Sequence, residues 1–296
     1  MAQFLTSIRN KVFATLIRQG AGCGFGARAI PTQHDEILQI PSRDEGIPIK
    51  VHVYKSKNPT TPSPVLINFH GSGFVIPMHG SDDDFCLHVA KSTPYTVLDV
   101  QYRLAPENMF PAGAQDAEDV VRYVLSRPQE FDVKNVSVSG FSAGANFALG
   151  LAGAVFPRDI FRHVVAFYPP VNLAKDPGTK VAPDPSGRPI PAYIAGVFND
   201  CYLPVGVARD QPLVSPSFIE AERWPDSMLV ITCAQDNLAP EAEELVEKIK
   251  GVGGSGVRHE RMEGVGHAWD KEAKAGTVQE ERKRRAYALA AEILTK

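Results

Sequence analysis

Apolar residues recur along the chain in two spacings, which predict an alternation of strands and helices. Short apolar runs predict eight strands, at residues 36–40, 47–54, 64–69, 95–100, 136–139, 163–168, 228–232 and 257–262. Helical spacing predicts helices at residues 81–91, 112–126, 143–155 and 241–250, and one more after Thr277. Strands that alternate with crossover helices favour a parallel sheet. We therefore expect an α/β fold with a mostly parallel eight-stranded sheet flanked by helices, and with an antiparallel edge formed by the first two strands.

Two stretches fall outside this alternation and define the expected domain organisation. Residues 171–216 contain eight prolines and no long periodic run, which is typical of an insertion that covers a site. Residues 1–34 precede the first strand. We expect an N-terminal cap segment at 1–34 and one catalytic domain at 35–296 with a cap insertion at 171–216.

The first twenty residues have the pattern of a basic amphipathic helix. They contain three basic residues, no acidic residue, and apolar residues at helical spacing, namely Phe4, Leu5, Ile8, Val12, Phe13, Leu16 and Ile17. The uninterrupted apolar core is too short for a secretory signal. Two interpretations remain: a helix that packs on the folded domain, which we favour, and an organelle-targeting peptide within residues 1–19.

Composition and charge point to a small-molecule partner. The 31 basic and 34 acidic residues leave a net charge of -3, which gives no field for nucleic acid or an anionic membrane. Four cysteines without metal-ligand spacing favour a reducing compartment, and we expect a cytoplasmic protein. No apolar run approaches the roughly 18 residues of a membrane span. We expect no integral membrane segment, and a monomer or homodimer.

The stretch from Gly140 to Gly144 has the pattern of a nucleophile at a sharp turn. A predicted strand precedes Ser142 and a predicted helix follows it. Such a corner strains the central residue, and it tolerates almost no side chain two residues before and two residues after. Gly140 and Gly144 meet that need. The hydroxyl of Ser142 would then stand near the positive end of the helix, where developing negative charge is stabilised.

A second glycine-rich turn follows another buried strand. Residues 70–74 read His-Gly-Ser-Gly-Phe, directly after the strand predicted at 64–69. Free backbone N–H groups in such a turn can bind an oxyanion, although an ordinary tight turn has the same composition. Gly71 to Gly73 is therefore a candidate oxyanion turn.

Two charged groups have structural interpretations. Ser81 is a candidate N-cap, and Asp82, Asp83 and Asp84 are read as partners of a helix dipole instead of a metal site. Arg103 and Glu107 are expected to pair with each other, or with nearby backbone, and so to hold a proline-containing loop. We expect no metal and no cofactor.

Three polar residues each follow a predicted strand in the way expected of a catalytic triad. Ser142, Asp236 and His267 occur in the chain order Ser, Asp, His, which is the order of α/β-hydrolase triads. Functional groups gather at the carboxyl ends of strands in open parallel sheets. Among the eight histidines, His267 alone combines a strand end with a glycine-bearing loop. These positions predict a serine hydrolase.

The chain resembles the hormone-sensitive-lipase-like family of α/β-hydrolases from about Val65 to its C-terminus. The resemblance rests on five motifs, at residues 70–74, 102–107, 140–144, 236–238 and 266–268. It implies an α/β-hydrolase fold with a small cap, and an oxyanion hole made by the backbone N–H groups of Ser72, Gly73 and Ala143. Ser72 stands where the family usually has glycine, so its side chain is expected to face the acyl site.

These residues predict a carboxylesterase for small or short-acyl esters that forms an acyl-enzyme. Phe74, Tyr193 and Phe198 are candidates to bind the substrate in an apolar pocket, although the aromatics of the insertion could equally form its own core. Resemblance to fungal members suggests secondary-metabolite esters. Two alternatives remain: a lyase, cyclase or dehydratase in the same pocket, and a ligand receptor without turnover, which the presence of His267 disfavours.

Overall fold

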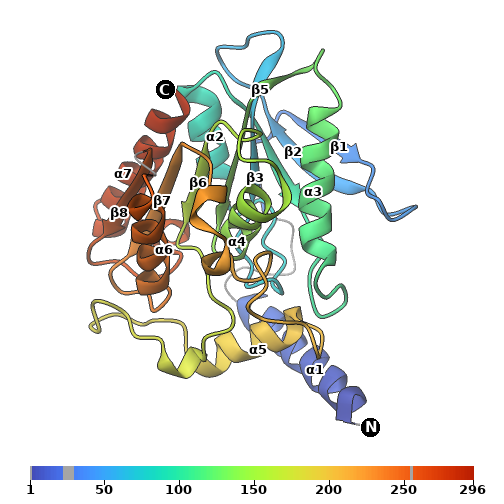
Figure 1. Cartoon of the computed structure of the whole chain (residues 1–296), viewed down its shortest axis with the longest axis vertical. Coiled ribbons are helices and arrows are strands. Elements are labelled where there is room, and N and C mark those ends of the chain that lie inside the picture. The colour runs from blue at the N-terminus through green and yellow to red at the C-terminus, as the bar shows by residue number, and fades with distance from the viewer. Residues whose placement is uncertain (1, 23–29, 254–255) are drawn as a thin grey trace.

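The computed structural model describes residues 2–22, 30–253 and 256–296, and it contains one eight-stranded sheet with helices on both faces (Figure 1). The strand order is β1-β2-β4-β3-β5-β6-β7-β8. The pairs β1 with β2 and β2 with β4 are antiparallel, and the remaining pairs are parallel. The strands are β1 Glu36–Ile40, β2 Ile49–Tyr54, β3 Ser63–Phe69, β4 Thr96–Gln101, β5 Phe131–Phe141, β6 Val164–Phe167, β7 Met228–Cys233 and β8 Val257–Met262. All eight predicted strands are confirmed.

Two apolar cores lie on opposite faces of the sheet. One face is covered by α2 (Asp83–Ser92) and α7 (Val278–Leu294), and the other by α3 (Ala112–Leu125), α4 (Ala143–Gly150) and α6 (Ala239–Gly251). Leu66 of β3 belongs to the first core, whereas its neighbours Val65 and Ile67 belong to the second. Successive side chains point to opposite faces of a strand. The central strands are mostly apolar because both of their faces are buried.

The helices predicted at 143–155 and after Thr277 are both present, and short 3₁₀ turns lie between the longer elements. Helix α4 continues as one π-helical turn, η1 (Leu151–Val155), so the predicted helix at 143–155 is present in two parts. Helix α7 begins at the predicted cap, because the hydroxyl of Thr277 accepts a hydrogen bond from the backbone N–H of Glu280. The 3₁₀ turns are η2 Pro177–Thr179, η3 Pro216–Phe218, η4 Ala221–Arg223 and η5 Trp269–Lys271. Within the described residues, no helix is long and apolar enough to cross a bilayer.

One helix from each of the two predicted cap segments, residues 1–34 and 171–216, lies beside the other at one end of the sheet (Figure 1). They are α1 (Ala2–Gly22) and α5 (Ala192–Tyr202). The Asn10 amide donates to the carbonyl of Asp200 at 2.6 Å, and Ala14 is buried. Most of the apolar stripe of this helix is not buried by the contact, since Val12, Phe13 and Leu16 are exposed. A small, partly polar face makes the contact.

The insertion at 171–216 contains a helix that the sequence analysis missed. Its apolar residues recur at the spacing of one helix face, namely Ile194, Val197, Phe198, Cys201 and Tyr202. This signal was present in the sequence. Because prolines are frequent in the insertion, no helix was expected there, yet α5 is 11 residues long.

The three aspartates at the start of α2 differ in their surroundings. Ser81 does not cap the helix; its hydroxyl donates to Asp82, which occupies the N-cap position. Asp82 is buried and accepts from Lys271 Nζ at 2.7 Å and from the Asn68 amide at 2.8 Å. Asp83 and Asp84 lie in the first turn, as predicted, where acidic side chains favour the helix dipole.

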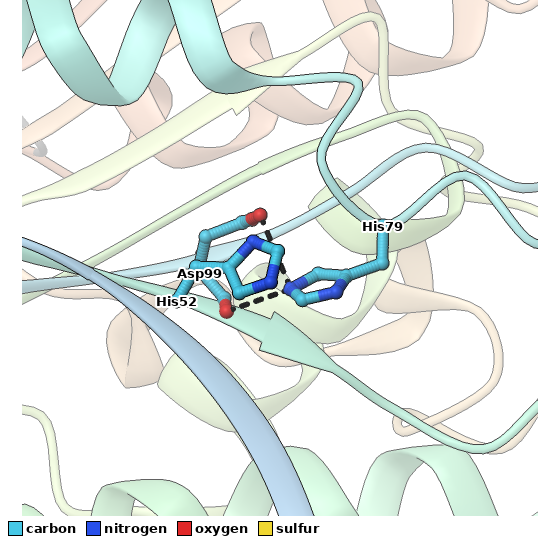
Figure 2. Close-up of side chains that lie close together, drawn as sticks. All are labelled: His52, His79 and Asp99. Atoms are coloured by element: carbon cyan, nitrogen blue, oxygen red, sulfur yellow. Dashed lines mark hydrogen bonds and ion pairs between the residues drawn. The ribbon is translucent and has the colours of Figure 1, made fainter. Parts of the chain in front are cut away.

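A stack of histidine rings crosses the antiparallel edge of the sheet (Figure 2). His52 of β2 lies opposite Asp99 of β4, and the His79 ring stacks on His52 at 4.0 Å between centroids. His34 stacks on the other side of His52 at 4.1 Å. Neither nitrogen of His52 has a hydrogen-bond partner among the described residues. Burial lowers the pKa of His52 to about 3 and that of His79 to about 4, so both rings are neutral at pH 7.

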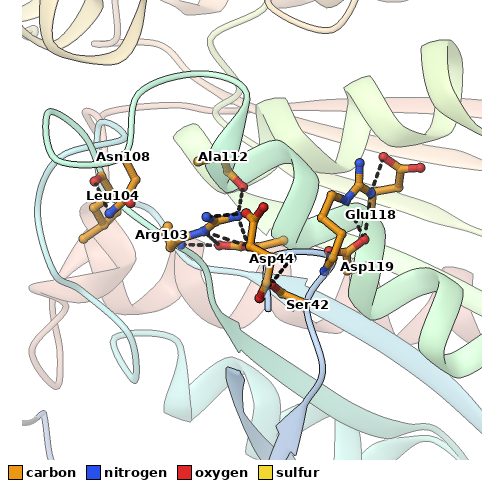
Figure 3. A network of polar contacts seen from close by, with 10 residues as sticks. Ser42, Asp44, Arg103, Leu104, Asn108, Ala112, Glu118 and Asp119 are labelled. Atoms are coloured by element: carbon orange, nitrogen blue, oxygen red, sulfur yellow. Dashed lines mark hydrogen bonds and ion pairs between the residues drawn. The ribbon is translucent and has the colours of Figure 1, made fainter. Parts of the chain in front are cut away.

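Arg103 holds the loop after β4 through the second of the two expected contacts, nearby backbone, because its guanidinium donates to the carbonyl of Ala112 at 3.4 Å (Figure 3). It pairs with Asp116 of α3 at 2.7 Å and with Asp44 at 2.7 Å, whereas Glu107 pairs with Arg18 of α1. The expected Arg103–Glu107 pair was therefore wrong. Asp116 is only 1% exposed, and Arg103 compensates the burial of its charge.

We predict that His52→Phe makes the fold less sensitive to acid. A histidine whose folded pKa lies below its unfolded value binds a proton more readily in the unfolded chain. Its contribution to stability is therefore complete above pH 6.5 and is lost as the pH falls below that value. Urea unfolding at pH 7 and pH 5 should show a loss of free energy that is smaller in the variant by about 2 kcal/mol. Equal losses in both proteins would contradict this prediction.

Candidate active site

Ser142 lies at the corner between β5 and α4, where the backbone is strained. Its φ is 50° and its ψ is -118°, and its N–H donates to the carbonyl of Phe167 at 2.9 Å. A Cβ at Gly140 would lie 2.3 Å from the backbone of Gly144, and a Cβ at Gly144 would lie 1.9 Å from the carbonyl oxygen of Phe69. No side chain fits at either position. The two glycines therefore allow the corner, as the sequence predicts.

The structure brings the three predicted triad residues together. The Oγ of Ser142 lies 2.9 Å from Nε2 of His267, and Nδ1 of His267 lies 2.7 Å from Oδ2 of Asp236. Asp236 is 0% exposed, and its other oxygen accepts from the N–H of Leu238 at 3.0 Å. The carboxylate can only accept, so it favours the tautomer with the proton on Nδ1. In that tautomer Nε2 is free to accept the hydroxyl proton of Ser142.

The turn after β3 lies beside Ser142 with its N–H groups available. A Cβ added to Gly71 would lie 3.5 Å from the Cβ of Ser142. The N–H groups of Ser72 and Gly73 donate to no acceptor in the described part of the chain. The N–H of Ala143 belongs to the first turn of α4, where backbone donors have no partner inside the helix. These are the three donors that the sequence predicts for an oxyanion.

The hydroxyl of Ser72 is directed into the protein. It accepts from the N–H of Phe74 at 2.9 Å and lies 2.8 Å from the hydroxyl of Tyr102, which donates to the carbonyl of His70 at 2.6 Å. Ser72 therefore donates to Tyr102. The expectation that this side chain faces the acyl site was wrong, because both of its hydrogen-bonding roles are satisfied within the turn.

Ser142 and His267 line one pocket of about 480 Å³ at the carboxyl ends of the parallel strands, whereas Asp236 lies buried behind His267. Its walls are mainly apolar, including Met78, Leu173, Ile190, Ile194 and Leu238. Among the described residues, four amino acids other than glycine have positive φ, and all four line this pocket, namely Phe74, Ser142, Tyr168 and Ala268. Backbone strain of this kind concentrates at functional sites.

Of the three aromatic residues predicted to bind the substrate, two line the pocket and one does not. Phe74 and Phe198 line the pocket, and the Phe198 ring lies so close to Gly73 that a Cβ there would approach it to 2.8 Å. Tyr193 does not line the pocket and is 72% exposed, so its assignment was wrong. Phe198 and Ile194 are four residues apart on one face of α5, whereas Tyr193 projects from another face.

A buried network of polar side chains holds Tyr168, whose ring packs against His267. The Tyr168 ring packs edge-on against His267 at 4.7 Å, and its hydroxyl donates to Asp270 at 2.7 Å. Burial alone would raise the pKa of Asp270, but Lys271 at 2.8 Å, together with two tyrosine hydroxyls, lowers it. Nothing in the sequence pattern indicated this network, since Asp270 and Lys271 look like ordinary loop charges.

In the described part of the chain, one group of three side chains has ligand atoms close enough for a metal ion. It consists of His52, His79 and Asp99, whose ligand atoms lie within 4.8 Å of one another (Figure 2). Imidazole lone pairs lie in the ring plane, and the two rings face each other at 4.0 Å between centroids with a tilt of 36° between their planes. The lone pairs therefore do not point to a common position, and one ring would have to turn before both could bind an ion.

Comparison with known proteins agrees with this architecture. The sequence profile of the alpha/beta hydrolase fold family matches residues 66–271. An ethyl acetate hydrolase of Pseudomonas putida is 28% identical, over 66% of this chain and 64% of its own length. An arylesterase of Saccharolobus solfataricus is 27% identical, over 73% and 72% respectively. The alignment thus covers less than two thirds of the first relative and somewhat more of the second.

A solved structure is similar over nearly the whole chain. The esterase of Pyrobaculum calidifontis superposes with a TM-score of 0.75 at 26% identity, and the match covers 99% of this chain and 92% of that one. The family match spans most of the sheet and includes the turn after β3, Ser142, Asp236 and His267. The chain therefore belongs to the α/β-hydrolase fold family, in its hormone-sensitive-lipase-like, ester-hydrolysing branch.

Proposed function

We propose that the protein is a serine carboxylesterase for small or short-acyl esters. The observation that carries the proposal is the continuous hydrogen-bonded series from Asp236 through His267 to Ser142, which ends at a pocket with apolar walls. The free backbone donors of the neighbouring turn add the second requirement of acyl transfer, since they can stabilise an oxyanion.

The first half of the reaction forms an acyl-enzyme. Ser142 Oγ attacks the ester carbonyl while Nε2 of His267 takes the hydroxyl proton, and Asp236 stabilises the imidazolium. The carbonyl oxygen becomes negative and accepts hydrogen bonds from the N–H groups of Ser72, Gly73 and Ala143. The tetrahedral intermediate then expels the alcohol, which takes its proton from His267. In the second half, water repeats these steps and releases the acid.

The pocket favours a small acyl group. Phe198 closes over Gly73, where no Cβ could be accommodated, so the space beside the candidate oxyanion donors is narrow. The apolar walls can bind aliphatic or aromatic parts of an ester by burying their surface. The relatives named for ethyl acetate and aryl ester hydrolysis are consistent with this substrate class.

We further propose that α1 and the insertion together form the cap. The side chain of Arg18 donates to the carbonyls of Val75 and Ala105 and pairs with Glu107. Val75 follows the candidate oxyanion turn directly, so α1 is tied to that turn at one end and to α5 at the other. A closed cap excludes water from the reacting carbonyl until hydrolysis of the acyl-enzyme.

Ser142→Ala should abolish acyl-enzyme formation. We expect kcat for a neutral aryl ester such as 4-nitrophenyl butyrate to fall on the order of a thousandfold or more, because the nucleophile is absent. An aryl phosphonate ester should phosphonylate Ser142 in the wild type with release of its aryloxide, so that the peptide containing Ser142 gains the mass of the phosphonyl group. Labelling of another serine, with full turnover by the alanine variant, would exclude this mechanism.

Asp236→Asn should leave the fold intact and favour the wrong tautomer of His267. The expected loss in kcat is about four orders of magnitude, the size seen for the same change in serine proteases. Asp226→Asn is the matched control, since Asp226 pairs with Arg158 at the surface. The acid is misassigned if the control variant loses activity and the Asp236 variant does not.

Removal of residues 1–19 should lower kcat/KM while the catalytic domain stays folded. The deletion removes Arg18 and the helix against α5, so the pocket loses one side of its cap. Circular dichroism checks the fold, and a series of neutral esters of graded chain length checks activity. Unchanged activity, with loss of organelle import by a tagged protein, would show that this stretch is a targeting peptide.

A further inference from the structure

We infer that the ester bound in this pocket carries a negative charge, and that Arg188 binds it. The inference rests on the proposed esterase function, and it assigns that function a substrate class: esters with a free carboxylate on either the acyl or the alcohol part. Arg188 would be a specificity-determining residue, because it contacts a part of the substrate that does not react.

The charges that line the pocket are all positive. They are Lys180, Arg188 and Lys271, and no aspartate or glutamate lines it. The chain as a whole has more acidic than basic residues, with a net charge of -3. The positive charge of the pocket lining therefore does not reflect an excess of basic residues in the protein as a whole.

Two of these three cations are already neutralised by protein carboxylates. Lys180 Nζ pairs with Glu241 at 2.6 Å, and Lys271 Nζ pairs with Asp82 and Asp270 at 2.7 and 2.8 Å. Arg188 has no hydrogen bond or ion pair with any described residue. Its guanidinium is the charge in the described lining that remains available to a ligand.

The backbone that carries Arg188 is fixed beside the candidate triad acid. A Cβ at Gly187 would lie 2.4 Å from the Gln235 side chain, so the chain passes directly over that residue. On the other side, the carbonyl of Ile190 accepts from the Asn237 amide at 3.0 Å. Gln235 and Asn237 are the two neighbours of Asp236. The backbone at Arg188 is thus held close to the candidate triad acid, and the Arg188 side chain itself is exposed.

The acidic residue nearest in this segment is engaged elsewhere. The carboxylate of Asp184 accepts from the N–H of Ser186 at 2.9 Å and from the Gln235 amide at 2.9 Å. Hydrogen bonds to Ser186 and Gln235 lower the pKa of Asp184, so it is ionised at neutral pH. Asp184 therefore holds the segment to β7 and does not occupy Arg188.

The chemistry of guanidinium indicates the ligand. Its planar array of donors matches a carboxylate, which it can bind through two parallel hydrogen bonds. A substrate that spans from Ser142 to Arg188 would place its ester carbonyl at the nucleophile and its carboxylate at the pocket wall. Hydrolysis would then yield a dicarboxylic acid if the charge is on the acyl part, or a hydroxy acid if it is on the alcohol part.

Matched pairs of esters separate charge from size. For the acyl part, 4-nitrophenyl hemisuccinate, hemiglutarate and hemiadipate are compared with their terminal carboxamides. For the alcohol part, 4-acetoxyphenylacetate is compared with 4-acetoxyphenylacetamide. For each pair we take the ratio of kcat/KM for the charged ester to that for the neutral ester, in wild type, Arg188→Gln, Arg188→Lys and Arg284→Gln.

We expect a charged-to-neutral ratio above one in the wild type for one of the two series, which identifies the part that carries the charge. Arg188→Gln should lower that ratio roughly two- to fivefold, the size expected of an exposed ion pair, and Arg188→Lys should restore part of it. High salt should reduce the wild-type ratio. Arg284→Gln removes an equal charge on α7, outside the lining, and should leave the ratio unchanged.

A ratio that Arg188→Gln leaves unchanged in both series would overturn the inference, and so would an equal fall in the Arg284→Gln control. Failure of the esterase proposal has a different signature. In that case the wild type hydrolyses neither member of any pair, or Ser142→Ala retains turnover of the neutral esters.

Discussion

The close contact between α4 and β3 at the corner that carries Ser142 is the constraint on which the site depends. Gly144 packs so tightly on the carbonyl of Phe69 that no Cβ could be accommodated, and Gly140 packs equally tightly on Gly144. This contact brings the end of β5 and the turn after β3 together. The candidate nucleophile Ser142 and the candidate oxyanion donors are thus neighbours because two glycines allow two backbones to meet.

The strain at this corner extends around the pocket and is maintained by buried polar contacts. Positive φ angles occur at Phe74, Tyr168 and Ala268 as well as at Ser142. Tyr168 is held through its hydroxyl by Asp270, and its ring in turn supports His267. Such conformations persist only where surrounding contacts determine them. Asp270 and Lys271 provide such contacts for Tyr168, although neither residue belongs to one of the catalytic motifs.

The proposed cap differs from the sheet in the contacts that hold it in place. The sheet has two continuous apolar cores, whereas α1 contacts the protein through Asn10, Ala14 and the guanidinium of Arg18, and leaves apolar side chains exposed. A surface of this kind stabilises less than a buried apolar stripe would. Specific polar contacts therefore position α1, and they connect it to the residues that follow the candidate oxyanion turn.

The sequence by itself determined the strands, the order of the candidate triad and the two glycine turns. Each depends on local chemistry: buried strands need continuous apolar residues, and a sharp corner needs glycines at two fixed positions. Only the tertiary structure decided which charges pair and which side chains reach the pocket. Arg103 meets Asp116 and not Glu107, the Ser72 hydroxyl turns to Tyr102, and Tyr193 faces solvent while Arg188 lines the pocket. Partners of long polar side chains come from segments far apart in sequence, so spacing along the chain does not specify them.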